Sequence, residues 1–226
     1  MAAKPVPQRS LPRLYLMTPP LDDAQDLLKS LAQLLGEADV AAVLLRLKPS
    51  DPRTLISRIK ALAPAIQDKG TALLLDGHTD LVARSGADGA HLSGIAALEE
   101  ALPVLKPDRI AGVGGLTTRH DAMTAGERGA DYVLFGEPDA AGHRPSIEAI
   151  GERLQWWDEL FELPSVAYAG TLEEVGAFAR AGADFIMAAD FVWSAAQGPI
   201  AAVREAHDLI RKAHAAMPAK AQAASG

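Results

Sequence analysis

The sequence predicts an α/β protein built as a single (β/α)8 TIM barrel, and three observations lead to this prediction. The triplet Gly-Ala-Asp begins at Gly86, Gly129 and Gly182, each time between a helix-like stretch and a short apolar run. Glycine readily takes the left-handed conformation that ends a helix, so each triplet predicts the step from a helix into a buried strand. The copies lie 43 and 53 residues apart (129−86 and 182−129), about twice the roughly 25 residues of one strand-and-helix unit. Hydrophobic residues form 49% of the chain and aromatic residues only 5%, which favours a barrel core of aliphatic side chains.

The first elements follow this alternation of strand and helix. Residues 13–17 are a strand signal that stops before two prolines, because proline cannot continue the hydrogen bonding of a strand. A helix over 22–35 follows, with its leucines on one face. Residues 40–45 form a continuous apolar run, as a parallel strand buried on both faces requires. Proline in the first turn then predicts a helix from Ser50-Asp51-Pro52 to about residue 70, and 71–75 is the third strand.

The same alternation continues to residue 214. The predicted order is a short helix ending at Gly86, strand 88–92, helix 95–105, strand 109–113, helix 118–128, strand 131–135, helix 146–161, strand 165–168, a helix begun by the capping signature Thr171-Leu172-Glu173-Glu174, strand 185–188 and helix 199–214. The predicted organisation is therefore one barrel over 13–214, with a flexible lead-in over 1–12 and a flexible tail over 215–226.

Composition excludes several classes of function. The net charge of −7 and the isoelectric point near 5.4 argue against nucleic acid or an anionic membrane as a partner. No apolar run approaches the roughly 20 residues that span a bilayer. The first ten residues lack an apolar signal core, so we expect a cytoplasmic protein. The chain has no cysteine, which excludes disulfides, thiolate metal sites and cysteine nucleophiles.

Ligands of a parallel barrel bind where the strands end, and this rule selects the candidate residues. Arg46 and Lys48 leave the second strand two residues apart on one side, so they predict an anion site, with a solvated surface pair as the alternative. Asp76 follows the third strand as a candidate metal ligand or proton acceptor, and capping of the next helix is the alternative. Arg46, Lys48 and Asp76 are the candidate catalytic residues.

Five further positions at strand ends are expected to contact substrate or its phosphate groups. They are His91, Gly115, Thr117, Arg144 and Gly170. The long polar loop over 139–144 would bring Arg144 over a bound anion, and a plain surface loop is the alternative. A hydrogen-bonded structural histidine and ordinary glycine turns are the alternatives for His91 and for the glycines.

Other sequence features narrow the choice of chemistry. The chain has no Walker loop and no Gly-x-Ser-x-Gly elbow, so nucleotide hydrolysis and serine esterase chemistry have no support. The aromatic residues Trp156, Trp157 and Phe161 lie near the end of the sixth predicted helix. They predict packing of that helix against the barrel, with a homodimer interface as the alternative.

Several segments, spread in order over residues 13–214, carry a family resemblance. They are Leu14-Tyr15-Leu16-Met17-Thr18, Val43-Leu44-Leu45-Arg46-Leu47-Lys48, Ala87-Asp88-Gly89-Ala90-His91-Leu92, Gly112-Val113, the stretch from Gly129 to Gly136, and Ala181-Gly182-Ala183-Asp184. In this ordered set the chain resembles the thiamine phosphate synthase family and its close relative, the thiazole tautomerase TenI.

The resemblance implies a definite activity. Thiamine phosphate synthases join a hydroxymethylpyrimidine pyrophosphate to a thiazole phosphate and release pyrophosphate with the help of Mg²⁺. Small phosphorylated substrates are then the expected partners. The resemblance also implies that Arg46 and Lys48 hold the pyrophosphate and that Asp76 lies at the metal position.

The chain departs from the family's pattern around the expected site. The departures are Leu44 for a glutamine, Gly77 and Ala96 for the two metal-binding aspartates, Gly115 for a serine, Thr117 for a histidine, Ala141-Gly142-His143-Arg144 for Thr-x-Thr-Lys, Ala169 for a glycine, and Ala188-Ala189-Asp190 for a serine turn. Asp190 would repel a phosphate placed near it.

Three functions follow from this combination of a matching scaffold and an altered site. The main prediction is a thiamine phosphate synthase-like enzyme, impaired or not. The second is a TenI-like tautomerase in which His120 or Asp76 transfers the proton. The third is a non-catalytic barrel that binds a small ligand or a partner protein.

Overall fold

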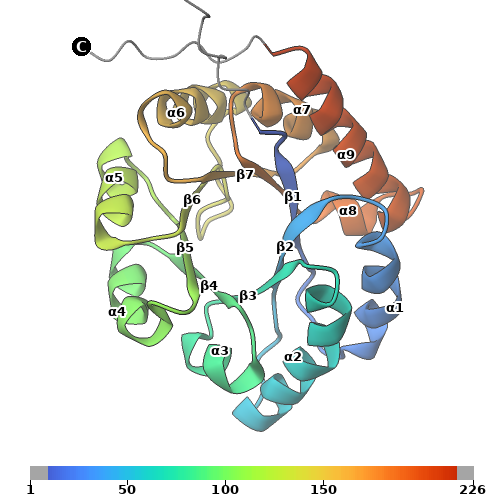
Figure 1. The fold of residues 1–226 in the computed structure, drawn as a ribbon. Helices are drawn as coiled ribbons and strands as arrows, with labels where there is room; N and C mark the ends of the chain where they lie inside the picture. Colours follow the sequence, from blue (N-terminus) through green and yellow to red (C-terminus); the bar gives the residue numbers. More distant parts are fainter. Residues whose placement is uncertain (1–9, 218–226) are drawn as a thin grey trace, which may run out of the picture.

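The computed structural model describes residues 10–217 and shows a closed parallel barrel inside a ring of helices (Figure 1). The strands are β1 (Arg13–Met17), β2 (Val40–Leu45), β3 (Ala72–Asp76), β4 (Gly89–Ser93), β5 (Ile110–Gly114), β6 (Tyr132–Phe135), β7 (Ser165–Ala169) and β8 (Phe185–Ala188). They pair in sequence order, and β8 closes the ring on β1. The predicted (β/α)8 TIM barrel is confirmed. Most of the predicted lead-in and tail lies outside the described residues.

The helices alternate with the strands as expected. They are α1 (Gln25–Leu34), α2 (Pro52–Gln67), α3 (Thr79–Ser85), α4 (Ile95–Leu105), α5 (Arg119–Arg128), α6 (Ile147–Leu160), α7 (Leu172–Arg180), α8 (Phe191–Ser194) and α9 (Pro199–Ala215). The sequence does not predict α8, because four residues are too few to show an apolar period. This short helix fills the connection after β8, where Trp193 Nε1 donates a hydrogen bond of 2.7 Å to the Met17 carbonyl of β1.

The Gly-Ala-Asp triplets end helices as predicted. Gly86 and Gly129 follow α3 and α5 with φ values of 81° and 102°, and Gly182 lies just after α7 with φ 97°. These values are in the left-handed region that glycine takes without strain. The alanine of each triplet is buried beneath the preceding helix, so the chain turns directly into the next strand.

The aspartate of each triplet binds the neighbouring strand through two hydrogen bonds. The Asp88 N–H donates to the Leu73 carbonyl at 2.8 Å, and the Leu73 N–H donates to the Asp88 carboxylate at 2.7 Å. Asp131 makes the same exchange with Ala111 of β5, with both distances at or below 2.8 Å. Asp184 does so with Ser165 of β7. These reciprocal pairs fix where strands β4, β6 and β8 begin.

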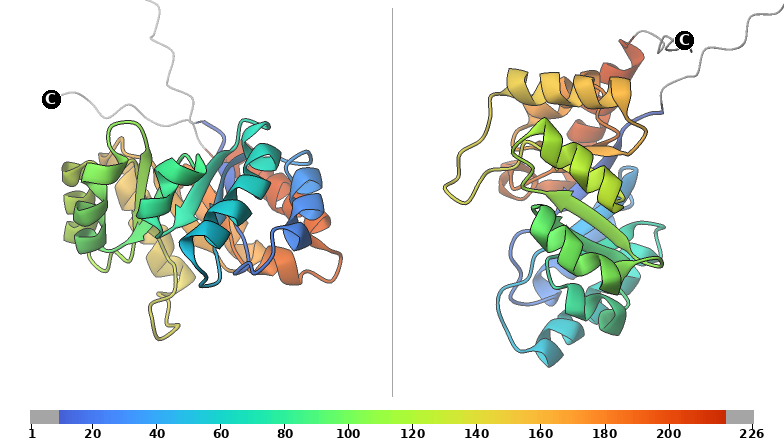
Figure 2. Two further views of the ribbon diagram at one scale, coloured as in Figure 1. Left: turned by 90° about the horizontal axis from the view of Figure 1, so that it is seen from below. Right: turned by 90° about the vertical axis from the view of Figure 1, so that its left-hand side faces the viewer.

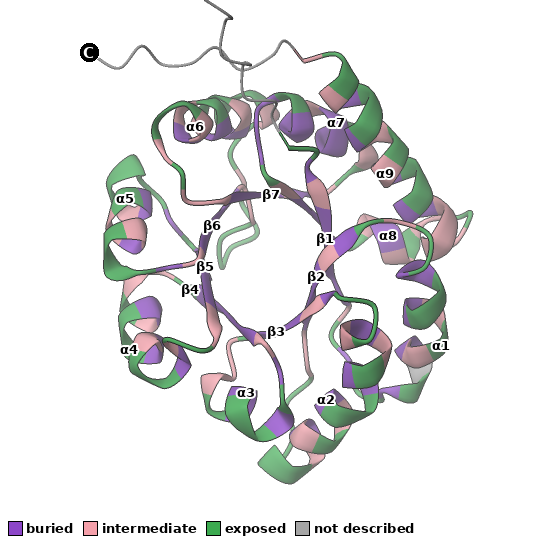
Figure 3. Ribbon diagram, viewed as in Figure 1, coloured by how far each residue is buried: buried purple, intermediate pink, exposed green. Residues whose placement is uncertain are grey.

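The apolar core has an inner and an outer layer. The inner layer fills the barrel with side chains such as Tyr15, Leu74 and Tyr132, and the outer layer lies between strands and helices. Figure 3 shows buried residues along the strands and exposed residues on the outward helix faces. In Figure 2 the yellow segment between β6 and α6 projects beyond the other loops. No helix within residues 10–217 is long and apolar enough to cross a membrane.

The aromatic cluster packs against the barrel. Trp157 is buried, faces Phe135 of β6 at 5.7 Å between ring centroids and stacks on Phe161 at 4.1 Å. Its Nε1 donates to the Leu163 carbonyl at 2.7 Å. Trp156 lies at the surface side of this group with Arg119 above its ring at 4.6 Å. These contacts explain the cluster by helix packing, and the homodimer stays a prediction.

Gly112 gives a direct test of the packing inside the barrel. A Cβ atom at Gly112 would lie 1.9 Å from Cζ of the buried Tyr132 ring, so we expect Gly112→Ala to destabilise the protein by about 3 kcal/mol. At Gly151 of α6, an added Cβ meets only the Ala181 Cβ at 3.9 Å, and Gly151→Ala should stabilise by about 0.5–1 kcal/mol. Urea unfolding of both variants measures the difference, and equal midpoints would contradict this packing.

Candidate active site

The cations after β2 lie at the carboxyl end of the barrel, and each has a carboxylate partner. Arg46 donates from Nε to the Thr18 carbonyl and from Nη2 to the Asp190 carboxylate. Lys48 Nζ lies 3.8 Å from the Asp22 carboxylate. Asp190 and Asp22 are both 67% exposed, so solvent screens these pairs. Asp190, which the sequence places near a phosphate position, lies beside the arginine expected to bind one.

Asp76 ends β3 on the same face as Leu74, which points into the barrel. The carboxylate reaches solvent, yet the surrounding strand ends remove part of its hydration and raise its pKa, an effect that Arg46 and His78 oppose. Helix α3 begins after His78 without a side-chain cap, so Asp76 does not cap it. Asp76 is therefore available for proton transfer at the mouth of the barrel.

The residues at the expected metal position do not fit a resident Mg²⁺ site. Gly77 and Ala96 stand where the resemblance expects the two metal-binding aspartates, and Ala96 lies exposed on α4. Within residues 10–217 there is no group of three histidine, aspartate or glutamate side chains able to hold a metal ion. Asp76 alone offers a single anionic ligand, which is too few for a dedicated site.

His91 belongs to a buried chain of hydrogen bonds across the barrel. Its Nδ1 lies 2.9 Å from the Tyr132 hydroxyl, which lies 3.0 Å from the Tyr15 hydroxyl. Burial lowers the pKa of His91 to about 4 and raises the pKa values of both tyrosines well above the usual range. All three groups are therefore uncharged at neutral pH. The structure thus adds a hydrogen-bonding role within the barrel to the position at which the sequence predicts a substrate contact.

Glu137 is a functional candidate to which the sequence prediction gives no role. Its Oε1 accepts a hydrogen bond from the Gly115 N–H, and burial raises its pKa. A Cβ atom at Gly114 would lie 2.3 Å from Glu137 Oε1 and 3.0 Å from His91 Nε2. Glycine at this position therefore leaves room for both groups. The polar residue just after β6 was visible in the sequence, but its burial was not.

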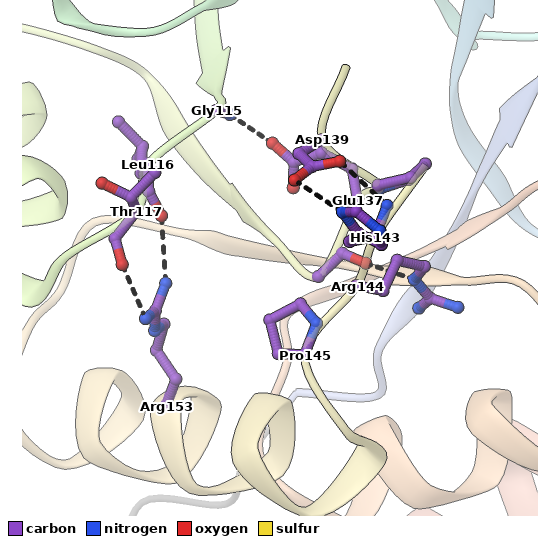
Figure 4. A pocket seen from close by; sticks show the side chains of 11 residues that line it. Gly115, Leu116, Thr117, Glu137, Asp139, His143, Arg144, Pro145 and Arg153 are labelled. Carbon is purple, nitrogen blue, oxygen red and sulfur yellow. Dashed lines mark hydrogen bonds and ion pairs between the residues drawn. The ribbon is translucent and has the colours of Figure 1, made fainter. Parts of the chain in front are cut away.

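Thr117 and Gly115 line a pocket of about 330 Å³ between the β5–α5 loop, the β6–α6 loop and helix α6 (Figure 4). The Thr117 hydroxyl donates to the Asp121 carboxylate at 3.0 Å, and Arg153 donates to the Thr117 carbonyl at 3.0 Å. These bonds hold Thr117 at the edge of the pocket. A ligand there would meet Glu137 across from Arg153.

Arg144 and Gly170 are brought together as expected, but the anion between them belongs to the protein. The Arg144 guanidinium donates to both oxygens of Glu174, at 3.1 and 3.0 Å, and to the carbonyls of Gly136 and Tyr168. The Gly170 N–H donates to Glu174 Oε2 at 2.6 Å. The predicted flap arginine is thus held against the start of α7 by a carboxylate 30 residues away in sequence.

Comparisons with known proteins agree with the sequence resemblance. The model of the family described as thiamine monophosphate synthase matches residues 14–190. The thiamine-phosphate synthase of Rhodospirillum centenum is 41% identical over 202 residues, which cover 88% of this chain and 98% of that protein. The thiamine-phosphate synthase of Hyphomonas neptunium is 38% identical over 85% of this chain and 90% of that protein.

Solved structures show the same fold. A thiamine phosphate pyrophosphorylase from Pyrococcus furiosus superposes with a TM-score of 0.74 at 21% identity, covering 89% of this chain and 96% of that one. A 3-hexulose-6-phosphate synthase superposes with a TM-score of 0.67 at 18% identity, covering 87% of this chain and 99% of that one. At these identities the likeness concerns the barrel and not its chemistry.

The buried imidazole predicts an acid-sensitive stability. Unfolding would return the pKa of His91 from about 4 to its ordinary 6.5, so the unfolded state binds the extra proton between these values. The stabilisation is complete above pH 6.5 and is lost as pH falls toward 4, by about 3 kcal/mol. We expect His91→Phe to remove this part of the pH dependence in urea unfolding between pH 7 and 4.

His120, exposed on α5, is the matched control for that experiment. His120→Phe removes a histidine without removing a buried one and should leave the pH dependence of the unfolding free energy as in the wild type. Because other carboxyl groups titrate over the same range, the comparison is between variants at each pH. Parallel curves for the wild type and His91→Phe would show that His91 is not held neutral by burial.

Proposed function

The chain belongs to the thiamine monophosphate synthase family, and on that basis we propose that it forms thiamine phosphate from a hydroxymethylpyrimidine pyrophosphate and a thiazole phosphate. The observation that carries the proposal is the family match over residues 14–190, at one end of which the strand termini gather Arg46, Asp76 and Arg144. A cytoplasmic enzyme that acts on small phosphorylated substrates is part of this proposal.

The reaction needs stabilisation of a leaving pyrophosphate. The C–O bond to the pyrophosphate breaks with its electron pair on oxygen, and the thiazole nitrogen supplies the pair for the new C–N bond. Arg46 and Lys48 are assigned to the developing charge on the leaving group. Their partners Asp190 and Asp22 are exposed, so each pair contributes about 1 kcal/mol or less, and pyrophosphate can replace these carboxylates at low cost.

The other residues of the mouth have separate roles in the proposal. Asp76 is assigned to the pyrimidine side, where its raised pKa suits exchange of a proton with the ring or its amino group. Because the donor set does not fit Mg²⁺, the chemistry is assigned to side chains of the protein alone. The TenI-like tautomerase and the binding-only barrel stay predictions; His120, one proton carrier proposed for the tautomerase, lies exposed on α5.

Arg46 tests the proposed reaction. With both substrates and Mg²⁺ in the assay, we expect Arg46→Ala to lower kcat/KM for thiamine phosphate formation by at least about a hundredfold, because one of two cations on the leaving group is lost. Arg53→Ala, on the exposed first turn of α2, is the matched control and should keep full activity. Product is measured by chromatography at several substrate concentrations.

The wild-type assay separates this proposal from its main rival. If the wild type forms no thiamine phosphate while either substrate raises its melting temperature, the binding-only barrel is favoured and the synthase proposal fails. If product forms equally fast in the wild type and in Arg46→Ala, the synthase proposal stands and the role given to Arg46 is wrong.

A further inference from the structure

The turn between β7 and α7 has the properties of an anion-binding position. The Gly170 N–H points into it, the amino-terminal end of α7 lies beside it, and the Arg144 guanidinium covers it. Main-chain N–H groups at a helix start together with a planar guanidinium favour a two-oxygen anion. A Cβ atom at Gly170 would lie 2.8 Å from Arg144 Nη1, so glycine permits this close approach.

The anion in this position is the side chain of Glu174. Oε1 accepts from Arg144 Nη1, and Oε2 accepts from Arg144 Nη2 and from the Gly170 N–H. The Glu174 side chain is only 8% exposed and that of Arg144 only 21%. The carboxylate therefore uses the donors that a phosphate would use, in a setting that solvent screens little.

A capping role for Glu174 does not account for these contacts. In a capping box the glutamate would accept the N–H of Thr171, the residue that caps α7. Here the Thr171 hydroxyl accepts the Glu174 N–H at 3.3 Å, while the carboxylate is directed to Gly170 and to Arg144 from another loop. The side chain thus joins the β6–α6 loop to the start of α7.

The two ends of the site differ in how easily a substrate anion displaces the resident carboxylate. At the β2 end, Asp190 is 67% exposed beside Arg46. At the β7 end, Glu174 is buried and makes three hydrogen bonds. A pyrophosphate can therefore enter at the first end, whereas an anion at the second end must compete with a desolvated, hydrogen-bonded pair.

We propose that Glu174 is a specificity-determining residue that competes with the substrate's own phosphate for Arg144 and Gly170. The phosphate of the thiazole then adds little to binding, and the acceptor class is a thiazole alcohol, whether phosphorylated or not. This inference rests on the proposed function for the identity of the acceptor. It extends that function to an acceptor that carries no charge at this end.

Kinetics with two acceptors test the proposal. In the wild type, kcat/KM for the thiazole phosphate and for the thiazole alcohol should agree within about threefold. Glu174→Gln leaves an acceptor for Arg144 but removes the competing charge, so it should raise the preference for the phosphorylated acceptor by at least about tenfold. Glu173→Gln removes the same charge from the exposed face of that turn and should leave the preference unchanged.

A second measurement does not depend on catalysis. Inorganic phosphate, compared with chloride at equal ionic strength, should raise the melting temperature of Glu174→Gln more than that of the wild type or Glu173→Gln. If no acceptor is turned over, the proposed function fails, and this measurement still decides the role of Glu174. If Glu174→Gln does not fold, the wild-type acceptor ratio decides it.

Two results would overturn the proposal. One is a wild type that prefers the phosphorylated acceptor by more than about a hundredfold, since Glu174 would then not be competing effectively. The other is a folded Glu174→Gln variant in which both the acceptor ratio and the phosphate-dependent melting temperature equal those of the wild type. In that case Glu174 only holds the β6–α6 loop in place.

Discussion

The geometry of the site depends on the reciprocal hydrogen bonds between the aspartate of each Gly-Ala-Asp triplet and the strand before it. Asp88, Asp131 and Asp184 each exchange two bonds with one residue of that strand, at the amino ends of the strands. Because the strands are only four to six residues long, fixing where they begin also fixes where they end. A slip of one residue would turn Asp76 or His91 from the inside of the barrel to the helix layer.

The carboxyl ends of the strands therefore bring together charges that are remote in sequence, and the resulting mouth is balanced rather than cationic. Arg46 meets Asp190, and Arg144 meets Glu174. Two further acids, Asp76 and Glu137, have raised pKa values because burial disfavours their charged forms. A site of this kind does not attract polyanions by its overall field; it binds them by replacing one anion with another at defined positions.

The fold could be predicted from the sequence because each strand and helix leaves a local signal, such as the glycine after α5 or the apolar run of β2. The strand-end rule also placed the candidate residues at the mouth. Their partners were beyond prediction, since Arg46 and Asp190 are 144 residues apart and meet only when the barrel closes. The acid expected to repel phosphate is instead the partner of Arg46, and Glu174 looked like an ordinary helix-capping residue.

The internal carboxylates also explain how the mouth can keep its arginines without a ligand. A buried guanidinium that lacks a partner is strongly destabilising, so a phosphate-binding arginine needs either solvent or an anion supplied by the protein. Glu174 supplies that anion for Arg144, and Asp190 supplies it for Arg46. Substrate affinity is then the difference between two anions on the same donors. Burial of the resident anion, and not the number of cations, decides how much of a substrate's charge the barrel can use.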